Sequence, residues 1–177
     1  MENDLIIRFD SLPSTSLKAK ELINNCVPWT VVVAEQQYSG HGTKGTDWFS
    51  PKGGLYFSII LPPANIQDLQ IITILSAFTI AKVIKNNFDL EPMIKIPNDI
   101  LINGKKFCGI LTENIIGQDV KFSIIGIGIN TNIIDFPDSL KDKATSILNE
   151  TGIKADNNKI LDEIILDLKN QFKEITN

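Results

Sequence analysis

The sequence predicts an α+β domain in which a mixed, largely antiparallel sheet is flanked by helices. Short apolar runs rich in β-branched residues, each bounded by turn residues, indicate five or more strands. Long segments with apolar residues at helical spacing indicate three or four helices. The pair Asn103-Gly104 joins two of the strand-like runs and is typical of a tight antiparallel hairpin.

The expected elements follow one another in a definite order. Strands are expected at residues 5–9, 30–35, 54–61, 93–96, 100–102, 105–113 and 120–130, with a turn at 117–119. Helices are expected after Ser14 or Thr15 as a cap, over 66–84, over 146–150 with Gly152 as its end, and over 157–175. The helix at 66–84 is apolar on more than one side but is interrupted by charged residues, which favours burial against the sheet over a membrane span.

Composition limits the class of protein. The 177 residues, 43% of them hydrophobic, are expected to form one compact domain. A net charge of −4 argues against general affinity for nucleic acid or an anionic membrane. The two cysteines are far apart, so neither a disulfide framework nor a zinc site is expected. With no apolar leader visible, we expect a cytoplasmic protein.

A glycine-rich polar loop separates two of the predicted strands. Gly40, Gly42 and Gly45 leave backbone N–H groups open to a carboxylate or phosphate, and Trp48 offers a flat face for a ring. Most glycine-rich loops are plain turns, so this loop alone leaves both interpretations open.

Further polar residues stand at strand ends. Asp99 could hold a magnesium ion or stabilise a turn, and Lys106 could be a solvated charge or could stabilise a developing anion. The glycines between 126 and 130 could ease bending of a strand or let the backbone lie close to a ligand.

The order of these motifs resembles the catalytic domain of biotin protein ligases, over residues 9–147. The matching motifs are Ser14-Thr15, Gln37 with its glycine-rich loop, Trp48-Phe-Ser-Pro, Lys95-x-Pro-Asn-Asp99, Lys106-x-x-Gly-Ile-Leu, Gly126-Ile-Gly-Ile-Asn130 and Ala144-Thr-Ser-Ile147. Several motifs in the correct order are far more specific than any one alone.

The resemblance implies a fold like that of class II synthetases and a reaction in two steps. Biotin and ATP would form biotinyl-5'-AMP, with Mg²⁺ and lysine offsetting the repulsion between carboxylate and phosphate. Biotin would then pass to a lysine of a biotin carboxyl carrier protein domain. Nucleic acid and membrane are not among the implied partners, and a homodimer is one possible assembly.

The resemblance also implies roles for particular residues, with Lys106 as the catalytic residue and Asp99 as the magnesium ligand. Ser14, Thr15 and Gln37 would bind the ureido ring, and Trp48 would pack against adenine. The biotin-binding set is Ser14, Thr15, Gln37, Gly40, His41, Gly42, Thr43, Lys106, Gly109 and Gly126, and the ATP- or adenylate-binding set is Thr43, Lys44, Trp48, Asn98 and Asn130.

The glycine-rich loop departs from the family pattern. Where these ligases commonly show Gly-Arg-Gly-Arg-x-Gly-Arg-x-Trp, this chain has His41, Thr43 and Thr46 in place of the arginines. Thr43 donates one hydrogen bond where arginine offers a charged fork, so we expect the adenylate to escape more readily. His41 is either a surface residue or a contact to the biotin carboxylate or the phosphate. Ile96 replaces a tryptophan of the family, which changes packing more than chemistry.

Two alternatives stay open at this stage. One is a lipoate ligase or acyltransferase that uses the same lysine and glycines on a different acid. The other is a degenerate module that binds biotin without transferring it. We expect neither an N-terminal helix-turn-helix, and hence no transcriptional repression, nor the small C-terminal β-domain of many relatives.

Overall fold

The structure is a computed structural model that describes residues 5–62, 66–116 and 121–176. Along the chain it contains β1 (Ile6–Phe9), α1 (Thr15–Leu22), the 3-10 turn η1 (Ile23–Asn25), β2 (Val31–Ala34), the 3-10 turn η2 (Thr43–Gly45), β3 (Leu55–Leu61), α2 (Ile66–Phe88), β4 (Met93–Lys95), β5 (Asp99–Ile102), β6 (Lys105–Ile116), β7 (Lys121–Ile129), α3 (Ile147–Thr151) and α4 (Asn157–Thr176). The α+β class is confirmed, and each predicted helix and strand is present with small shifts at its ends. The predicted turn at 117–119 lies outside the described residues.

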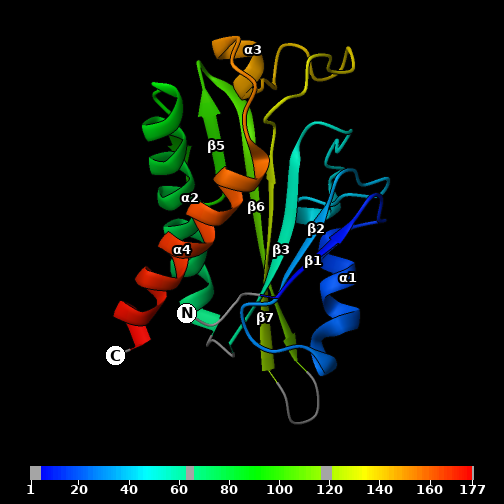
Figure 1. Ribbon diagram of the computed structural model, residues 1–177, viewed down its shortest axis with the longest axis vertical. Helices are drawn as coiled ribbons and strands as arrows, with labels where there is room; N and C mark the ends of the chain where they lie inside the picture. Colours follow the sequence, from blue (N-terminus) through cyan, green and yellow to red (C-terminus); the bar gives the residue numbers. More distant parts are fainter. Residues whose placement is uncertain (1–4, 63–65, 117–120, 177) are drawn as a thin grey trace.

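The strands form one seven-stranded sheet in the order β1-β2-β3-β7-β6-β5-β4 (Figure 1). Only β1 and β2 run parallel; the other neighbours are antiparallel. The sheet is therefore mixed and largely antiparallel, as predicted. Strand β7 lies between β3 and β6, so it connects strands β1–β3 to strands β4–β6 within the sheet.

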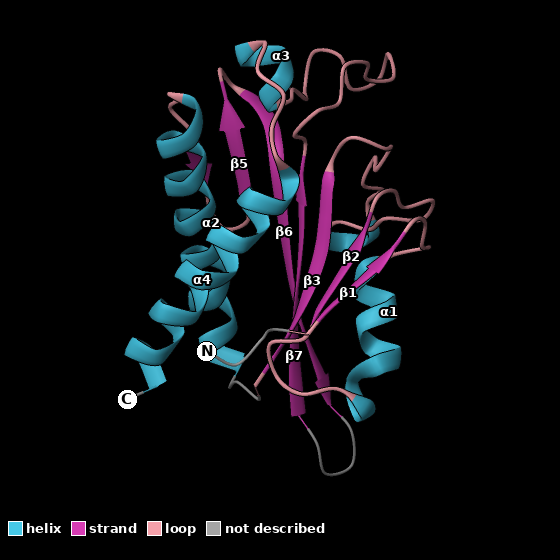
Figure 2. Cartoon of the chain, in the orientation of Figure 1, coloured by secondary structure: helices cyan, strands magenta, loops and turns pink. Residues whose placement is uncertain are grey.

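Helices cover the two faces of the sheet unequally. Helices α2 and α4 pack on one face, and α1 packs on the other (Figure 2). Strand β7 shows why: Ile125, Ile127 and Ile129 belong to the core beneath α2 and α4, while Gly126 and Gly128 alternate with them. Because successive side chains of a strand point to opposite faces, the glycines open the α1 face.

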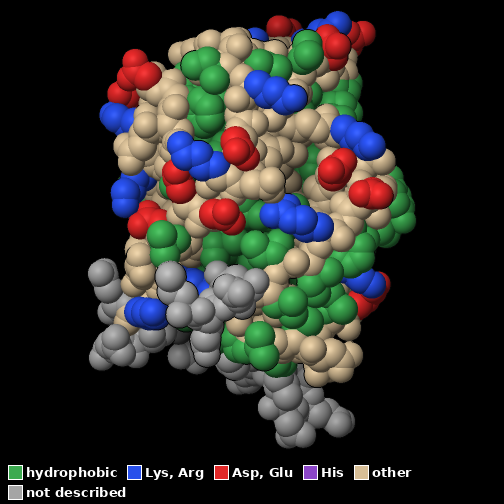
Figure 3. Space-filling view, viewed as in Figure 1, with side chains coloured by type: hydrophobic (Ala, Val, Ile, Leu, Met, Phe, Trp, Pro, Cys, Tyr) green, Lys and Arg blue, Asp and Glu red, His purple; other side chains and the backbone are tan. Residues whose placement is uncertain are grey.

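Helix α2 is the one described helix whose length and hydropathy would suit a membrane span, over Gln70–Phe88. In this structure it packs against β6 and α4, and Ile80 and Ile84 are fully buried. The core helix of a globular domain has these properties, which agrees with the sequence-based expectation. Lys82 of α2 pairs with Asp167 of α4 at 3.1 Å, and charges of both signs are interspersed on the face shown in Figure 3.

The two short helices differ in how they begin. In α3, Ser146 accepts a hydrogen bond from Asn149 N–H, and Gly152 ends the helix in the left-handed conformation, as predicted. In α1, Ser14 occupies the N-cap position but its side chain makes no capping hydrogen bond. The prediction of a hydroxyl cap at Ser14 or Thr15 is wrong, because Gln37 supplies the acceptor, as described below.

Candidate functional site

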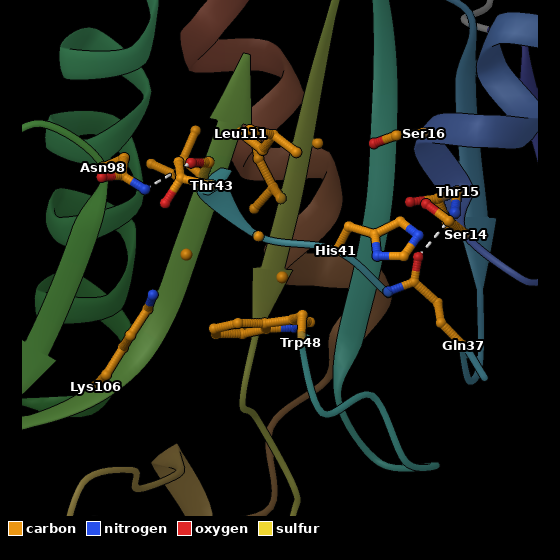
Figure 4. A pocket seen from close by; sticks show the side chains of 16 residues that line it. Ser14, Thr15, Ser16, Gln37, His41, Thr43, Trp48, Asn98, Lys106 and Leu111 are labelled. Carbon is orange, nitrogen blue, oxygen red and sulfur yellow. Dashed lines mark hydrogen bonds between the residues drawn. The ribbon is translucent and has the colours of Figure 1, made fainter. Parts of the chain in front are cut away.

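A hollow opens on the α1 face, between the sheet and the glycine-rich loop (Figure 4). It contains about 450 Å³ of unfilled space, a figure that includes its open mouth. The start of α1, the glycine-rich loop and strands β6 and β7 supply most of its walls. The lining residues are Ser14, Thr15, Ser16, Gln37, His41, Gly42, Thr43, Trp48, Asn98, Lys106, Gly109, Ile110, Leu111, Gly126, Ile127 and Gly128.

Two glycines paired across β6 and β7 carry the indole of Trp48. Gly109 and Gly128 stand directly opposite each other. A Cβ at Gly109 would lie 3.1 Å from Trp48 Cζ3, and one at Gly128 would overlap Trp48 Nε1. Position 128 must therefore be glycine for the ring to lie on the sheet, whereas a side chain at position 109 would require the ring to move by a few tenths of an ångström. Trp48 Nε1 is buried and has no hydrogen-bond partner within the described ranges.

Lys106 reaches the same place from β6. Its Nζ lies 5.1 Å from the centre of the Trp48 ring and 2.6 Å from Asp99 Oδ1. A shift in register between Ile100 and Leu101 marks a bulge in the β5–β6 pair, a feature that commonly re-aims side chains beside a site. Asp99 thus acts as the counter-ion of the lysine in this structure, and its predicted role as a magnesium ligand stays a prediction.

A cluster of hydroxyl groups forms the opposite wall, at the start of α1. Ser58 Oγ donates to Thr15 Oγ1 at 2.8 Å and lies 3.0 Å from Ser16 Oγ. Gln37 Oε1 accepts the Thr15 N–H at 2.8 Å and so performs the capping expected of a serine or threonine. The Gln37 Nε2 in turn donates to Ser50 Oγ at 2.9 Å, which fixes the amide. The wall is a preorganised set of polar groups beside apolar strands.

The glycine-rich loop folds back on itself above the sheet. Gly42 N–H donates to Thr46 O at 2.7 Å, and Trp48 N–H donates to Gly40 O at 2.9 Å. The Gly42 N–H, expected to be open to an anion, is therefore occupied within the loop in this conformation. His41 lies on the side of Ser14 and Gln37, and Thr43 lies across the hollow near Asn98 (Figure 4).

The structure brings together most of the predicted site residues. Ser14, Thr15, Gln37, His41, Gly42, Thr43, Trp48, Asn98, Lys106, Gly109 and Gly126 all line the hollow. Gly40 and Asp99 lie behind the lining, against Ser50 and Lys106 respectively. Asn130 is buried and donates through Nδ2 to Thr145 O at 3.1 Å, so its adenylate-binding role stays a prediction. The Lys44 side chain lies outside the described residues.

The sequence analysis named neither Ser16 nor Ser58 as a site residue. Ser58 sits in β3, whose seven residues are all buried, and faces Gly126 on β7. A hydroxyl inside an otherwise apolar strand needs a buried polar partner, and that was the available signal. Gly128 is one of the alternating glycines for which the sequence leaves open both strand bending and close approach to a ligand, and the structure places it in the lining of the hollow.

Cys108 lies close to the site in sequence but faces the opposite side of the sheet. It is fully buried in the core beneath α2 and α4. Burial raises the pKa of its thiol far above the ordinary value, although nearby Lys106 acts to lower it. The Cys108 thiol is therefore held in the neutral form and is no nucleophile for this site.

Comparison with known proteins adds to this geometry. The sequence profile of the Biotin/lipoate A/B protein ligase family matches residues 6–130. The chain belongs to this family. Among curated members, it is 42% identical over 175 residues to the Bifunctional ligase/repressor BirA of Bacillus subtilis, covering 96% of this chain and 54% of that protein. It is 29% identical to the Biotin--[acetyl-CoA-carboxylase] ligase of Paracoccus denitrificans, covering 89% of this chain and 68% of that protein.

A solved member of the family shares the fold. The biotin protein ligase of Aquifex aeolicus, in complex with biotin and ATP, superposes with a TM-score of 0.88 at 30% identity, over 97% of this chain and 72% of that one. The chain thus spans about half the length of the Bacillus relative and most of the Aquifex structure.

Proposed function

We propose that this protein is a biotin protein ligase, which forms biotinyl-5'-AMP from biotin and ATP and transfers biotin to a lysine of a biotin carboxyl carrier protein domain. The observation that carries the proposal is the convergence of Lys106 and Trp48 on the Gly109–Gly128 pair, in one hollow whose far wall holds hydroxyl groups. A cation, a ring-stacking surface and a polar wall match the carboxylate, adenine and ureido parts of the adenylate.

The polar wall would hold the ureido ring of biotin. This ring offers both donors and acceptors, and Ser14, Thr15 and Gln37 present both kinds of group along one side of the hollow. Gly126 makes room for the Ser16 hydroxyl of this wall, because a Cβ there would lie 2.5 Å from Ser16 Oγ. Biotin would then point its carboxylate toward Lys106.

Lys106 would act by charge and position. In the first step a carboxylate oxygen of biotin attacks the α-phosphorus of ATP and pyrophosphate leaves, and Lys106 Nζ offsets the negative charge that collects there. In the second step a neutral lysine amine of the carrier attacks the acyl carbon, AMP leaves, and the amide nitrogen loses a proton. In this structure the Lys106 amino group pairs with Asp99 at 2.6 Å. The biotin carboxylate and the phosphate of ATP would replace Asp99 as its partners.

Asp99 fits a magnesium ion in a limited way. Magnesium is commonly bound by one or two carboxylates together with substrate phosphates and water. Asp99 supplies one carboxylate, beside Lys106. The described residues contain no group of three or more metal-ligating side chains. The ion would neutralise phosphate charge, and Asp99 would hold it once Lys106 has turned to the substrate.

The carrier domain, the cytoplasmic location and a homodimer belong to the proposal as well. The Paracoccus relative carries the name of a biotin--[acetyl-CoA-carboxylase] ligase, and the chain covers only part of the length of the Bacillus protein. The predicted absence of the flanking domains stays a prediction.

The deciding experiment incubates the protein with labelled biotin, ATP and Mg²⁺, with and without a biotin carboxyl carrier domain. We expect biotinyl-5'-AMP in both reactions and labelled carrier only in the second. A carrier whose acceptor lysine is replaced by arginine is the matched control. Labelling with lipoate in place of biotin would point to the lipoate alternative. Binding of biotin without any adenylate would support the degenerate module and overturn the proposal.

A further inference from the structure

The backbone of Lys106 is held by a segment that is distant in sequence. Strand β7 ends at Ile129. Beyond that point, at Lys106, strand β6 pairs with the segment at 143–145 in place of β7. Lys106 N–H donates to Lys143 O at 2.8 Å, and Thr145 N–H donates to Lys106 O at 3.1 Å. The lysine therefore depends on this added segment, and not on β7, for hydrogen bonds on that side.

One carboxylate, that of Glu150, ties this segment to the other side of the lysine. Thr145 Oγ1 donates to Glu150 Oε1 at 2.5 Å. Asn103 Nδ2 donates to Glu150 Oε2 at 2.6 Å, and Asn103 stands in the tight turn that joins β5 to β6, three residues before Lys106. Glu150 thus bridges the two stretches of chain that hold Lys106.

The bridge consists of two hydrogen bonds to the Glu150 carboxylate, and the helix that carries Glu150 is itself held in place. Both donors are neutral and the acceptor is a carboxylate, so these are charge-assisted hydrogen bonds, which are shorter and stronger than neutral ones. Thr145 is 4% exposed, so water competes little at that end, whereas the hydrogen bond from Asn103 is exposed. Helix α3, which carries Glu150, is itself fixed because Ser146 Oγ donates to Ile133 O at 2.6 Å.

We propose that Glu150 is a positioning residue for Lys106: its carboxylate clamps the β5–β6 turn to segment 143–145 and thereby sets the lysine Nζ against Asp99 and Trp48. Glu150 is not among the residues that line the hollow, so it acts through the lysine and not on the substrate. The consequence for catalysis rests on the proposed ligase function; the consequence for the lysine's position does not.

The first test measures single-turnover formation of biotinyl-5'-AMP at saturating biotin and ATP. Glu150→Ala removes both acceptors and should slow this step by about tenfold to a hundredfold, the range that small misplacements of a reacting group produce. Glu150→Gln should restore much of the rate, because its carbonyl can accept from Asn103 while its amide donates to Thr145 Oγ1. Binding of biotin alone should change little, since its ureido wall lies at the start of α1.

A matched control lies in the same helix. Thr151 Oγ1 donates to Ile147 O and accepts from Ile153 N–H, so Thr151→Ala weakens the end of α3 without touching the bridge. Its rate should stay within about twofold of the starting protein. In a Lys106→Ala background, Glu150→Ala should cause no further loss, because there is no lysine left to position. An equal loss in both backgrounds would overturn the proposal.

A second readout needs no catalysis. Lys106 lies over the Trp48 ring, so its Cε–H signal in the NMR spectrum of protein with labelled lysine should be displaced by the ring current, and the signal is assigned by its loss in Lys106→Arg. Glu150→Ala should move this signal toward that of a solvated lysine, and Thr151→Ala should not. An unmoved signal in Glu150→Ala would refute the clamp. If the starting protein makes no adenylate, the proposed function fails while this measurement still decides the position of Lys106.

Discussion

The two faces of the sheet are built from the same strands but differ in what they support: a packed core on one face and the binding hollow on the other. On the α2 and α4 side, isoleucines and Phe57 form a continuous buried core. On the α1 side, a smaller core that includes Val32, Ile60 and Ile124 packs beside α1. The hollow lies next to it, where the strands carry Ser58, Gly126 and Gly128. The difference shows that one strand can supply stability through its odd positions and a binding surface through its even ones, because successive side chains point to opposite faces.

The largest expected contrast comes from two neighbours on β3. Phe57 is fully buried in the core, and Phe57→Ala should lower the free energy of unfolding by about 3–5 kcal/mol through lost packing and a cavity. Ser58→Ala, on the other face, should lower it by about 1 kcal/mol through its lost hydrogen bonds, yet weaken biotin binding. Urea denaturation and biotin titration check both. An equal loss of stability in the two variants would show that the faces are not specialised.

Lys106→Ala should remove activity and leave the fold intact. Loss of the positive charge is expected to slow biotinyl-5'-AMP formation by about 10²–10³-fold, the usual effect of deleting one group that stabilises developing charge. The neighbouring Lys105 is a matched control, because its Nζ donates to Lys141 O at the surface, and Lys105→Ala should retain the rate. Circular dichroism and the same single-turnover assay separate folding from chemistry. A similar rate in both variants would exclude Lys106 from the reaction.

Gly128→Ala tests whether the glycine pair is needed to make room for the Trp48 indole. The new methyl group would overlap the indole and push it off the sheet, so ATP affinity should fall by roughly tenfold, within the usual cost of overpacking. Tryptophan emission, recorded with Trp29→Phe so that Trp48 is the one remaining indole, should shift to longer wavelength. In a Trp48→Ala background, Gly128→Ala should have no such effect on ATP affinity. A persistent loss there would mean that the glycine serves the ligand directly.

Thr43→Arg tests whether the glycine-rich loop retains the adenylate weakly. Thr43 lines the hollow near Asn98, where an arginine could donate charged hydrogen bonds to the adenylate (Figure 4). Such bonds contribute about 1.5–3 kcal/mol, so dissociation of biotinyl-5'-AMP should slow by about tenfold or more. Thr43→Gln, which lengthens the side chain and can donate hydrogen bonds but adds no charge, is the control. Equal off-rates for Thr43→Arg and the starting protein would remove the idea that the loop retains the adenylate weakly.

The sequence was sufficient to predict the helices, the strands and most of the residues that line the hollow. Apolar periodicity and the Asn103-Gly104 turn identified strands and helices, because these signals depend on neighbours in the chain. The partners of particular side chains could not be predicted in this way. Gln37 caps α1 from 22 residues away, Asp99 pairs with Lys106, and the segment at 143–145 holds Lys106. These contacts depend on how distant elements meet, which no local pattern records.

The central place of β7 has a consequence for how the protein is made. When the ribosome has released only the first 120 residues, the wall built by β1–β3 and the wall built by β5–β6 both exist as sequence, but the strand that must lie between them has not emerged. The binding site therefore cannot assemble before β7 has emerged, and it forms through long-range pairing. A nascent chain that stops before β7 will not bind biotin at this site.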